Sequence, residues 1–231
     1  MSYITRHLTL ITVALVMAFS AYGYAEQAAP VNLADYKGVI KLACVGDSIT
    51  EGLGAAGGQS WPDQIKKMLG EKWVVRNFGV SGATLLNTND KPYQKEGAFI
   101  KALEFTPDVV VIMLGTNDTK AQNWAHKDTF AADYHNLISK FTALSSKPRI
   151  FICYPPYISG EGKFGINEAN TLAEFPMIDA TAKATKSMII NVHAALAGKD
   201  ALIPDRVHPN TEGATVIATA VFYGLTGTLA K

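Results

Sequence analysis

The sequence predicts an α/β domain: a doubly wound, flavodoxin-like parallel sheet of five strands with helices on both faces. Short, wholly apolar runs alternate along the chain with amphipathic segments of helical length. Strands that are apolar throughout are typical of a parallel sheet covered on both faces. The chain has no internal repeat and no low-complexity linker, so residues 26–231 are expected to form one domain with one large core.

Residues 1–25 are predicted to be a cleaved signal peptide that is not part of the fold. A basic start at Arg6 precedes an apolar stretch over residues 8–21, and small residues stand at positions 23 and 25. This arrangement is typical of a secretory signal, whereas a membrane span needs roughly 20 apolar residues. A retained anchor is the less favoured alternative. The mature protein is expected to be secreted or periplasmic, with no stable membrane insertion after cleavage.

The elements of the domain follow one another in a regular order. The apolar run 39–45 predicts the first strand. Ser60 is suited to cap a helix that carries Pro62 in its first turn and ends at Gly70. The further elements expected are strand 73–78, helix 93–105, strand 109–114, helix 127–144, strand 149–154, helix 175–186, strand 188–192 and helix 211–225.

Charge and cysteine usage exclude several classes of function. The chain has 21 Lys and Arg against 20 Asp and Glu, without a basic stripe, so no nucleic-acid partner is expected. Cys44 and Cys153 lie in strands that a third strand should separate, which predicts two buried free thiols. The histidines lack companion ligands at metal-binding spacing, so no metal is expected. Asp118 is predicted to be solvent-facing or capping.

The segment 52–57 reads Gly-x-Gly-x-x-Gly, the fingerprint of a dinucleotide site. It lies several residues beyond the first strand, and Arg76-Asn77 stands where the acidic residue that binds the ribose is expected. We therefore interpret the segment as a flexible loop and expect no cofactor.

Unusual residues follow the predicted strands at four places. In doubly wound sheets, ligands bind at the carboxyl ends of the strands. The four segments are Gly46-Asp47-Ser48, Gly79-Val80-Ser81-Gly82, Gly115-Thr116-Asn117-Asp118 and Asp205-Arg206-Val207-His208. In this order they resemble the four motif blocks of the SGNH (GDSL) hydrolase family, and the resemblance covers nearly all of the mature chain. It implies a serine esterase.

The residue types in these segments suit acyl transfer. A serine hydroxyl needs an adjacent base, which makes Ser48 the candidate nucleophile and His208 the candidate base. Asp205, three residues before His208, is suited to orient the imidazole. The family resemblance implies three oxyanion donors: the backbone N–H of Ser48, the backbone N–H of Gly82 and the side-chain amide of Asn117. Asp47 is expected to bond loop backbone.

The substrate is indicated less directly. The segments 115–120 and 164–167 resemble the branch of sialate O-acetylesterases and carbohydrate acetylesterases. Candidate sugar-stacking residues are Trp61, Trp124, Tyr157 and Phe164. The loop 155–173 is polar and glycine-rich, which favours a short acyl group, most simply acetyl, on a small-molecule or glycan ester. Two alternatives stay open: a periplasmic thioesterase or lysophospholipase of the same family, and a non-catalytic carbohydrate-binding protein on a hydrolase scaffold.

Overall fold

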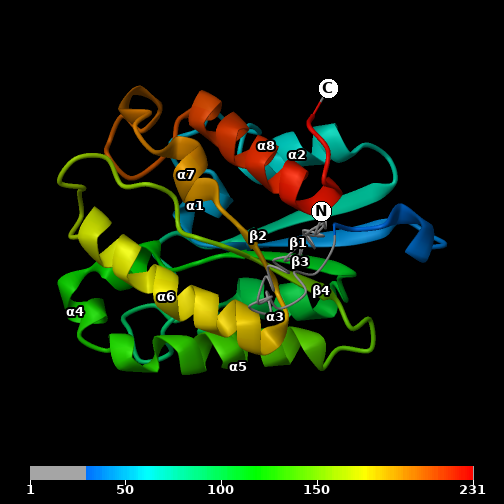
Figure 1. Ribbon diagram of the computed structural model, residues 1–231, viewed down its shortest axis with the longest axis horizontal. Coiled ribbons are helices and arrows are strands. Elements are labelled where there is room, and N and C mark those ends of the chain that lie inside the picture. Colours follow the sequence, from blue (N-terminus) through cyan, green and yellow to red (C-terminus); the bar gives the residue numbers. More distant parts are fainter. Residues whose placement is uncertain (1–29, 231) are drawn as a thin grey trace, which may run out of the picture.

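A parallel sheet of five strands runs through the protein (Figure 1). The computed structural model describes residues 30–230, so the signal-peptide prediction for residues 1–25 lies outside the described residues. The strand order is β2-β1-β3-β4-β5. The strands are β1 (Ile40–Gly46), β2 (Trp73–Gly79), β3 (Val109–Met113), β4 (Arg149–Cys153) and β5 (Met188–Ile190). The predicted α/β fold is confirmed.

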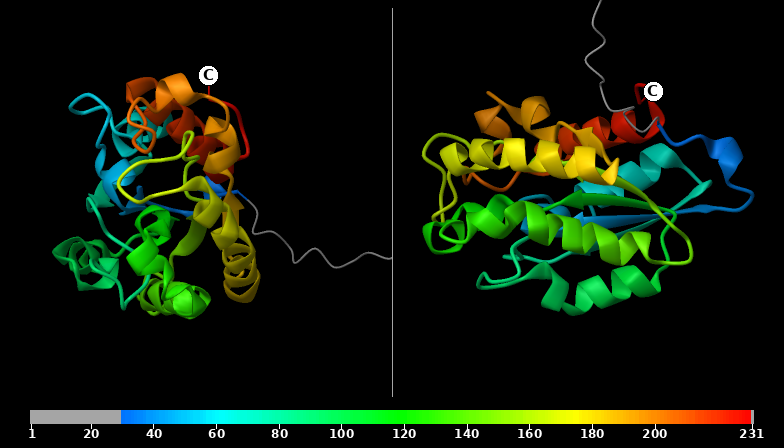
Figure 2. Two further views of the ribbon diagram at one scale, coloured as in Figure 1. Left: turned by 90° about the vertical axis from the view of Figure 1, so that its left-hand side faces the viewer. Right: turned by 60° about the horizontal axis from the view of Figure 1, so that its bottom comes forward.

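Helices cover both faces of the sheet (Figures 1 and 2). Helices α2 (Trp61–Leu69), α7 (Val192–Leu196) and α8 (Thr211–Thr226) lie on one face, and α3 (Gly97–Glu104), α5 (Phe130–Thr142) and α6 (Glu168–Thr185) lie on the other. Two short helices, α1 (Ser48–Glu51) and α4 (Ala121–Trp124), follow β1 and β3. Within residues 30–230, none of the helices combines the length and apolar character that a membrane span requires.

The buried side chains form one cluster on each face of the sheet. In β1, Leu42 and Cys44 belong to the cluster under α2 and α8, whereas Ala43 and Val45 belong to the cluster under α3, α5 and α6. Successive side chains of a strand point to opposite faces, so an apolar strand contributes to both layers. Burying each large apolar side chain contributes about 1.5–3 kcal/mol to the stability of the folded state. The continuous apolar runs in the sequence are explained by this two-sided burial.

The sheet order creates the switch point at which such folds bind ligands. From β1 the chain moves to β2 on one side of β1, and then crosses to β3 on the other side. Gly46 pairs with Gly79 of β2 and with Met113 of β3, so the three strands end at a common level. The carboxyl ends of β1 and β3 therefore border the crevice where chemistry is expected.

Both cysteines are buried free thiols, as predicted. Cys44 lies on β1 and Cys153 on β4, and β3 runs between these strands. Burial raises the pKa of both thiols, which keeps them protonated and unreactive.

The start of α2 also matches its prediction. The hydroxyl of Ser60 accepts from the backbone N–H of Asp63, and the Asp63 carboxylate accepts from the backbone N–H of Ser60. This reciprocal pair satisfies two N–H groups that the first turn would otherwise leave free. Gly70 ends the helix at a φ of 70°.

Several predicted boundaries were wrong. Helix α6 begins at Glu168, seven residues before the predicted start, because the Asn167 side chain caps it by accepting from the N–H of Asn170. Pro176 lies inside this helix, where the missing N–H removes one backbone hydrogen bond without ending it. The predicted helix 93–105 is divided at Glu96, whose backbone is extended. The last strand ends at Ile190, since Asn191 caps α7.

Candidate active site

Ser48 is the first residue of α1, directly after β1. The Oδ1 atom of Asp47 accepts from the N–H of Ile49 at 2.9 Å, so Asp47 caps the helix as expected. The N–H of Ser48 lies in the first turn and has no intrahelical acceptor, which leaves it available to a ligand. Asp47 is buried, and this burial raises the pKa of its carboxyl to about 6.

Two glycines allow α1 to pack against the strand ends. A Cβ on Gly46 would lie 2.6 Å from the carbonyl oxygen of Met113, and one on Gly79 would lie 2.2 Å from the backbone nitrogen of Glu51. Real Cβ atoms do not approach backbone atoms this closely, so glycine is required at both positions. The position of Ser48 therefore depends on residues that carry no side chain.

Ser48, His208 and Asp205 form a continuous hydrogen-bonded chain. The Oγ atom of Ser48 lies 3.0 Å from Nε2 of His208, and Nδ1 of His208 lies 2.7 Å from Oδ2 of Asp205. Ser48 and His208 are 5% and 6% exposed. A hydroxyl, an imidazole and a carboxylate in this order can generate a serine nucleophile.

A tight local turn fixes Asp205 relative to His208. The Oδ1 atom of Asp205 accepts from the backbone N–H groups of Val207 and His208, at 3.0 and 2.6 Å. Arg206 between them has a φ of 74°, in the left-handed region. Partial burial works to raise the pKa of Asp205, but the backbone and imidazole hydrogen bonds of His208, together with the Val207 N–H, bring it below its ordinary value. The carboxylate therefore stays ionised beside the imidazole.

Asn117 and Gly82, the other predicted oxyanion donors, lie on adjoining loops. The Nδ2 atom of Asn117 donates to the backbone carbonyl oxygen of Ala83 at 3.1 Å. The backbone carbonyl oxygen of Asn117 accepts from Nδ2 of Asn123 at 2.9 Å. An amide carries two N–H groups, so one N–H of Asn117 remains for a ligand. Gly82 has a φ of 80°, which a residue with a side chain rarely adopts.

Asp118 was wrongly predicted to be solvent-facing or capping. It is fully buried, and its two carboxyl oxygens accept from the backbone N–H groups of Leu85 and Leu86, both at 2.9 Å. These bonds tie the loop that contains Gly82 to the loop that contains Asn117. Burial raises the pKa of Asp118 to about 7.

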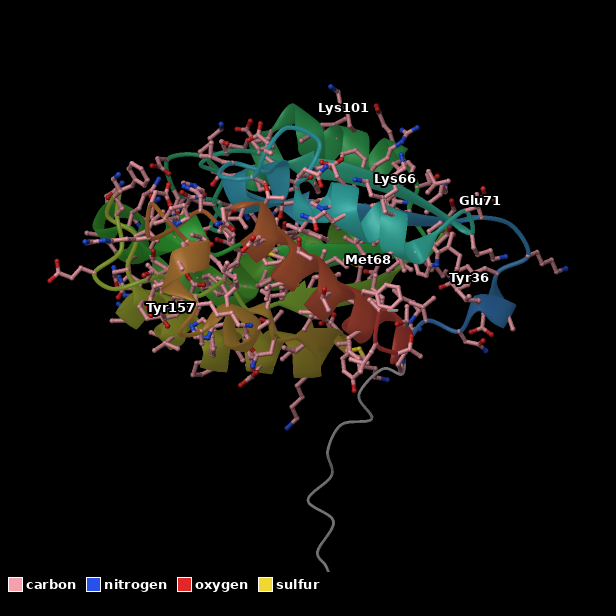
Figure 3. All side chains as sticks on the ribbon, turned by 90° about the horizontal axis from the view of Figure 1, so that it is seen from above. Tyr36, Lys66, Met68, Glu71, Lys101 and Tyr157 are labelled. Atoms are coloured by element: carbon pink, nitrogen blue, oxygen red, sulfur yellow. The ribbon has the colours of Figure 1, made fainter. Side chains whose placement is uncertain are left out.

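The four aromatic residues predicted to bind sugar have different environments. Phe164 is 57% exposed, and its ring centroid lies 6.0 Å from that of His208. Tyr157 contacts the ring of His193 edge-on at 5.8 Å, and Figure 3 shows it at the end of the molecule opposite Tyr36. Trp124 is half-buried on α4. Of the four, Phe164 makes a ring contact with the catalytic candidates.

Trp61 belongs to the core, so its predicted role in sugar stacking was wrong. The side chain is fully buried under the sheet, and its Nε1 atom donates to the hydroxyl of Thr50 at 3.2 Å. A stacking platform needs an accessible face, which this indole does not present.

Among the described residues, no group of three or more His, Cys, Asp and Glu side chains is arranged to hold a metal ion. The pair of His193 and Glu168, 2.6 Å apart, joins α7 to α6. The Oε2 atom of Glu168 also accepts from the N–H of Ile158. This pair therefore fixes the loop between β4 and α6.

Comparison with known sequences places the chain in a well-defined group. A family model described as GDSL-like Lipase/Acylhydrolase matches residues 44–216. An acetylxylan esterase from Xylanibacter ruminicola is 35% identical over 203 residues, which cover 79% of this chain and 42% of that protein. The chain thus spans about two fifths of the length of the curated relative it matches.

Solved structures share the fold at low sequence identity. A carbohydrate acetylesterase from Sinorhizobium meliloti aligns with a TM-score of 0.65 and 20% identity, over 79% of this chain and 96% of that one. An acetylxylan esterase from Geobacillus stearothermophilus aligns with a TM-score of 0.62 and 23% identity, over 81% and 95%. At these identities the comparison establishes the fold.

Replacing Gly46 by alanine is expected to destabilise the protein by about 1–3 kcal/mol, because the added methyl group meets the Met113 carbonyl and the Thr50 side chain. The measurement is the urea midpoint followed by circular dichroism. Gly57→Ala is the matched control, since a Cβ on Gly57 meets no atom within 4 Å. Equal midpoints for the two variants would contradict the argument.

Proposed function

The chain belongs to the GDSL-like lipase/acylhydrolase family, a family of carboxylic ester hydrolases, and from this premise we propose that it is a secreted serine esterase that removes acetyl groups from carbohydrate. The observation that carries the proposal is the chain of hydrogen bonds from Ser48 through His208 to Asp205. The apolar stretch over residues 8–21 supports export.

In the proposed reaction, the Oγ atom of Ser48 attacks the ester carbonyl while Nε2 of His208 takes the hydroxyl proton. The ionised Asp205 stabilises the imidazolium that forms. The negative charge on the carbonyl oxygen is met by the N–H groups of Ser48 and Gly82 and by the amide of Asn117. His208 then returns the proton to the leaving sugar oxygen, which leaves an acyl-enzyme on Ser48.

The second half of the reaction releases the acid. A water molecule attacks the acyl carbonyl and gives a proton to His208, and the same donors again hold the oxyanion. The Ser48–acyl bond breaks, the proton returns to the Ser48 oxygen, and acetate departs. The enzyme is thereby restored without a cofactor.

The environment of the triad supports a small acyl group on a sugar. Ser48 and His208 are almost fully buried, so a compact acetyl group approaches more easily than a long chain. Phe164 presents an exposed aromatic face beside His208, where a sugar ring bonded to the acyl oxygen would lie. The name of the relative from Xylanibacter ruminicola, an acetylxylan esterase, agrees with this substrate class.

Ser48→Ala is expected to lower kcat on p-nitrophenyl acetate by about 10⁴-fold or more, because the variant has no nucleophile. Ser139→Ala on α5 is the control for loss of a serine hydroxyl, and circular dichroism checks the fold. Undiminished turnover in Ser48→Ala would overturn the mechanism.

The same assay with octanoate and decanoate esters tests acyl length, and faster cleavage of the long esters would favour the thioesterase or lysophospholipase alternative.

Asn117→Ala is expected to lower kcat by about 10²–10³-fold with little change in KM. The reason is that the Asn117 amide donates a stronger hydrogen bond to the oxyanion of the transition state than to the carbonyl oxygen of the bound substrate. Asn117→Asp keeps the shape but replaces the donor with an acceptor, so it should be at least as impaired. Steady-state kinetics on p-nitrophenyl acetate measure both variants. An Asn117→Asp enzyme of normal kcat would exclude Asn117 as a donor.

Phe164→Ala is expected to raise KM for an acetylated xylo-oligosaccharide about 3–10-fold, through loss of a stacking surface. Turnover of p-nitrophenyl acetate should change less than twofold, since that ester carries no sugar. Phe164→Trp is the matched variant and should retain sugar affinity. If Phe164→Ala impairs both substrates equally, Phe164 supports His208 and does not bind sugar.

A further inference from the structure

Glu174 is a buried acid that the proposed reaction does not use. It lies on α6 and is 0% exposed. In the described part of the chain, neither of its carboxyl oxygens has a hydrogen-bond partner. Buried carboxyl groups are normally bonded or paired, because removing them from water is costly. Such a group at a fixed place in the fold therefore calls for an explanation.

The carboxyl group of Glu174 occupies the space beside Gly115. A Cβ on Gly115 would lie 2.3 Å from Oε2 of Glu174 and 2.8 Å from Cγ of Pro155, and Gly115 has a φ of 124°. Gly115 opens the loop that carries Asn117, and its carbonyl oxygen accepts from the N–H of Asp118 at 2.9 Å. Glu174 thus packs against the base of the loop that carries the amide donor, where β3 and β4 both end.

Within residues 30–230, the titratable groups that face Glu174 from the surrounding elements provide no positive charge. They are Asp118 in the loop after β3, Asp47 after β1 and the buried hydroxyl of Tyr134 on α5. Burial raises the pKa of Glu174 well above its ordinary value, and the nearby Asp118 and Asp47 raise it further. Burial without a hydrogen-bond partner and beside two other acids therefore favours the uncharged form of Glu174.

We propose that Glu174 is a positioning residue for Asn117: as an uncharged carboxylic acid it fills the space beside Gly115 and holds the loop in place without adding a negative charge next to that loop. The inference rests on the proposed function, in which Asn117 donates to the oxyanion. An ionised Glu174 would oppose the charge that develops on the carbonyl oxygen. In this proposal, the proton on Glu174 favours catalysis because it removes a negative charge that would oppose the oxyanion.

Kinetics of two variants test the inference. Glu174→Gln keeps the shape and stays uncharged, so its kcat on p-nitrophenyl acetate at pH 7 should lie within about threefold of the parent enzyme. Glu174→Ala removes the contact with Gly115 and should lower kcat more than tenfold with little change in KM. The parent enzyme should lose kcat at alkaline pH as Glu174 ionises, and Glu174→Gln should lose less. Glu104→Gln, exposed on α3, is the control.

Stability provides a second readout that does not depend on catalysis. In the unfolded chain Glu174 ionises near its ordinary pKa of about 4.3, whereas the folded protein keeps the proton. The unfolded state then binds fewer protons, so the parent protein loses stability relative to Glu174→Gln as pH rises above about 4.3. Urea midpoints of both proteins between pH 4 and pH 9 should diverge with rising pH.

The outcomes separate the two proposals. A parent enzyme that hydrolyses none of the tested esters would overturn the proposed function. An active parent enzyme with Glu174→Gln as impaired as Glu174→Ala would overturn the role of Glu174 alone. A difference between urea midpoints that is constant across pH would show that Glu174 is ionised in the fold, which also contradicts the inference. If Glu174→Ala does not fold, the glutamine variant still decides both readouts.

Discussion

The geometry of the site depends on the close packing of α1 against the ends of β1 and β2. Because Gly46 and Gly79 have no side chains, these strands contact α1 directly at Thr50 and Glu51. Asn77 reinforces this contact, since its Nδ2 atom donates to the carbonyl oxygen of Thr50 at 2.7 Å. The hydroxyl and the N–H of Ser48 are thus placed by the rigid sheet and not by a mobile loop. Preorganisation of this kind is what an oxyanion site requires.

Close packing at a glycine also holds the loop that carries His208. Gly54 packs against it so closely that a Cβ would lie 2.7 Å from the carbonyl oxygen of Pro209 and 3.0 Å from Cβ of His208. On the other side, Val207 joins Ile158 and Ile166 in a small buried cluster. Gly54 therefore has a packing role. Close backbone approach is also what a dinucleotide fingerprint requires of its glycines.

Elements marked by repeated sequence patterns could be predicted from the sequence, whereas the burial of single polar or aromatic side chains could not. The strands and α2 follow from apolar runs and from the cap at Ser60, since periodicity and capping are local properties. The burial of Trp61, Asp118 and Glu174 depends on segments far apart in the chain, so nothing adjacent in the sequence indicates it. The start of α6 was misplaced for a related reason. The helix continues past Pro176, and Ile178 two residues later is buried in the core, so tertiary packing is present where proline removes one hydrogen bond.

Four acids near the site have pKa values shifted in different directions because their environments differ. Asp205 is partly exposed and accepts three hydrogen bonds, which lower its pKa, whereas burial raises the pKa of Asp47, Asp118 and Glu174. Ionisation of Asp47, Asp118 and Glu174 together would gather three negative charges in one part of the fold. In the proposed mechanism, Asp205 stabilises the imidazolium of His208, and an uncharged Glu174 adds no charge against the oxyanion. The fold thus places the carboxyl group that we propose orients His208 where ionisation is favoured, and the other three where burial opposes it.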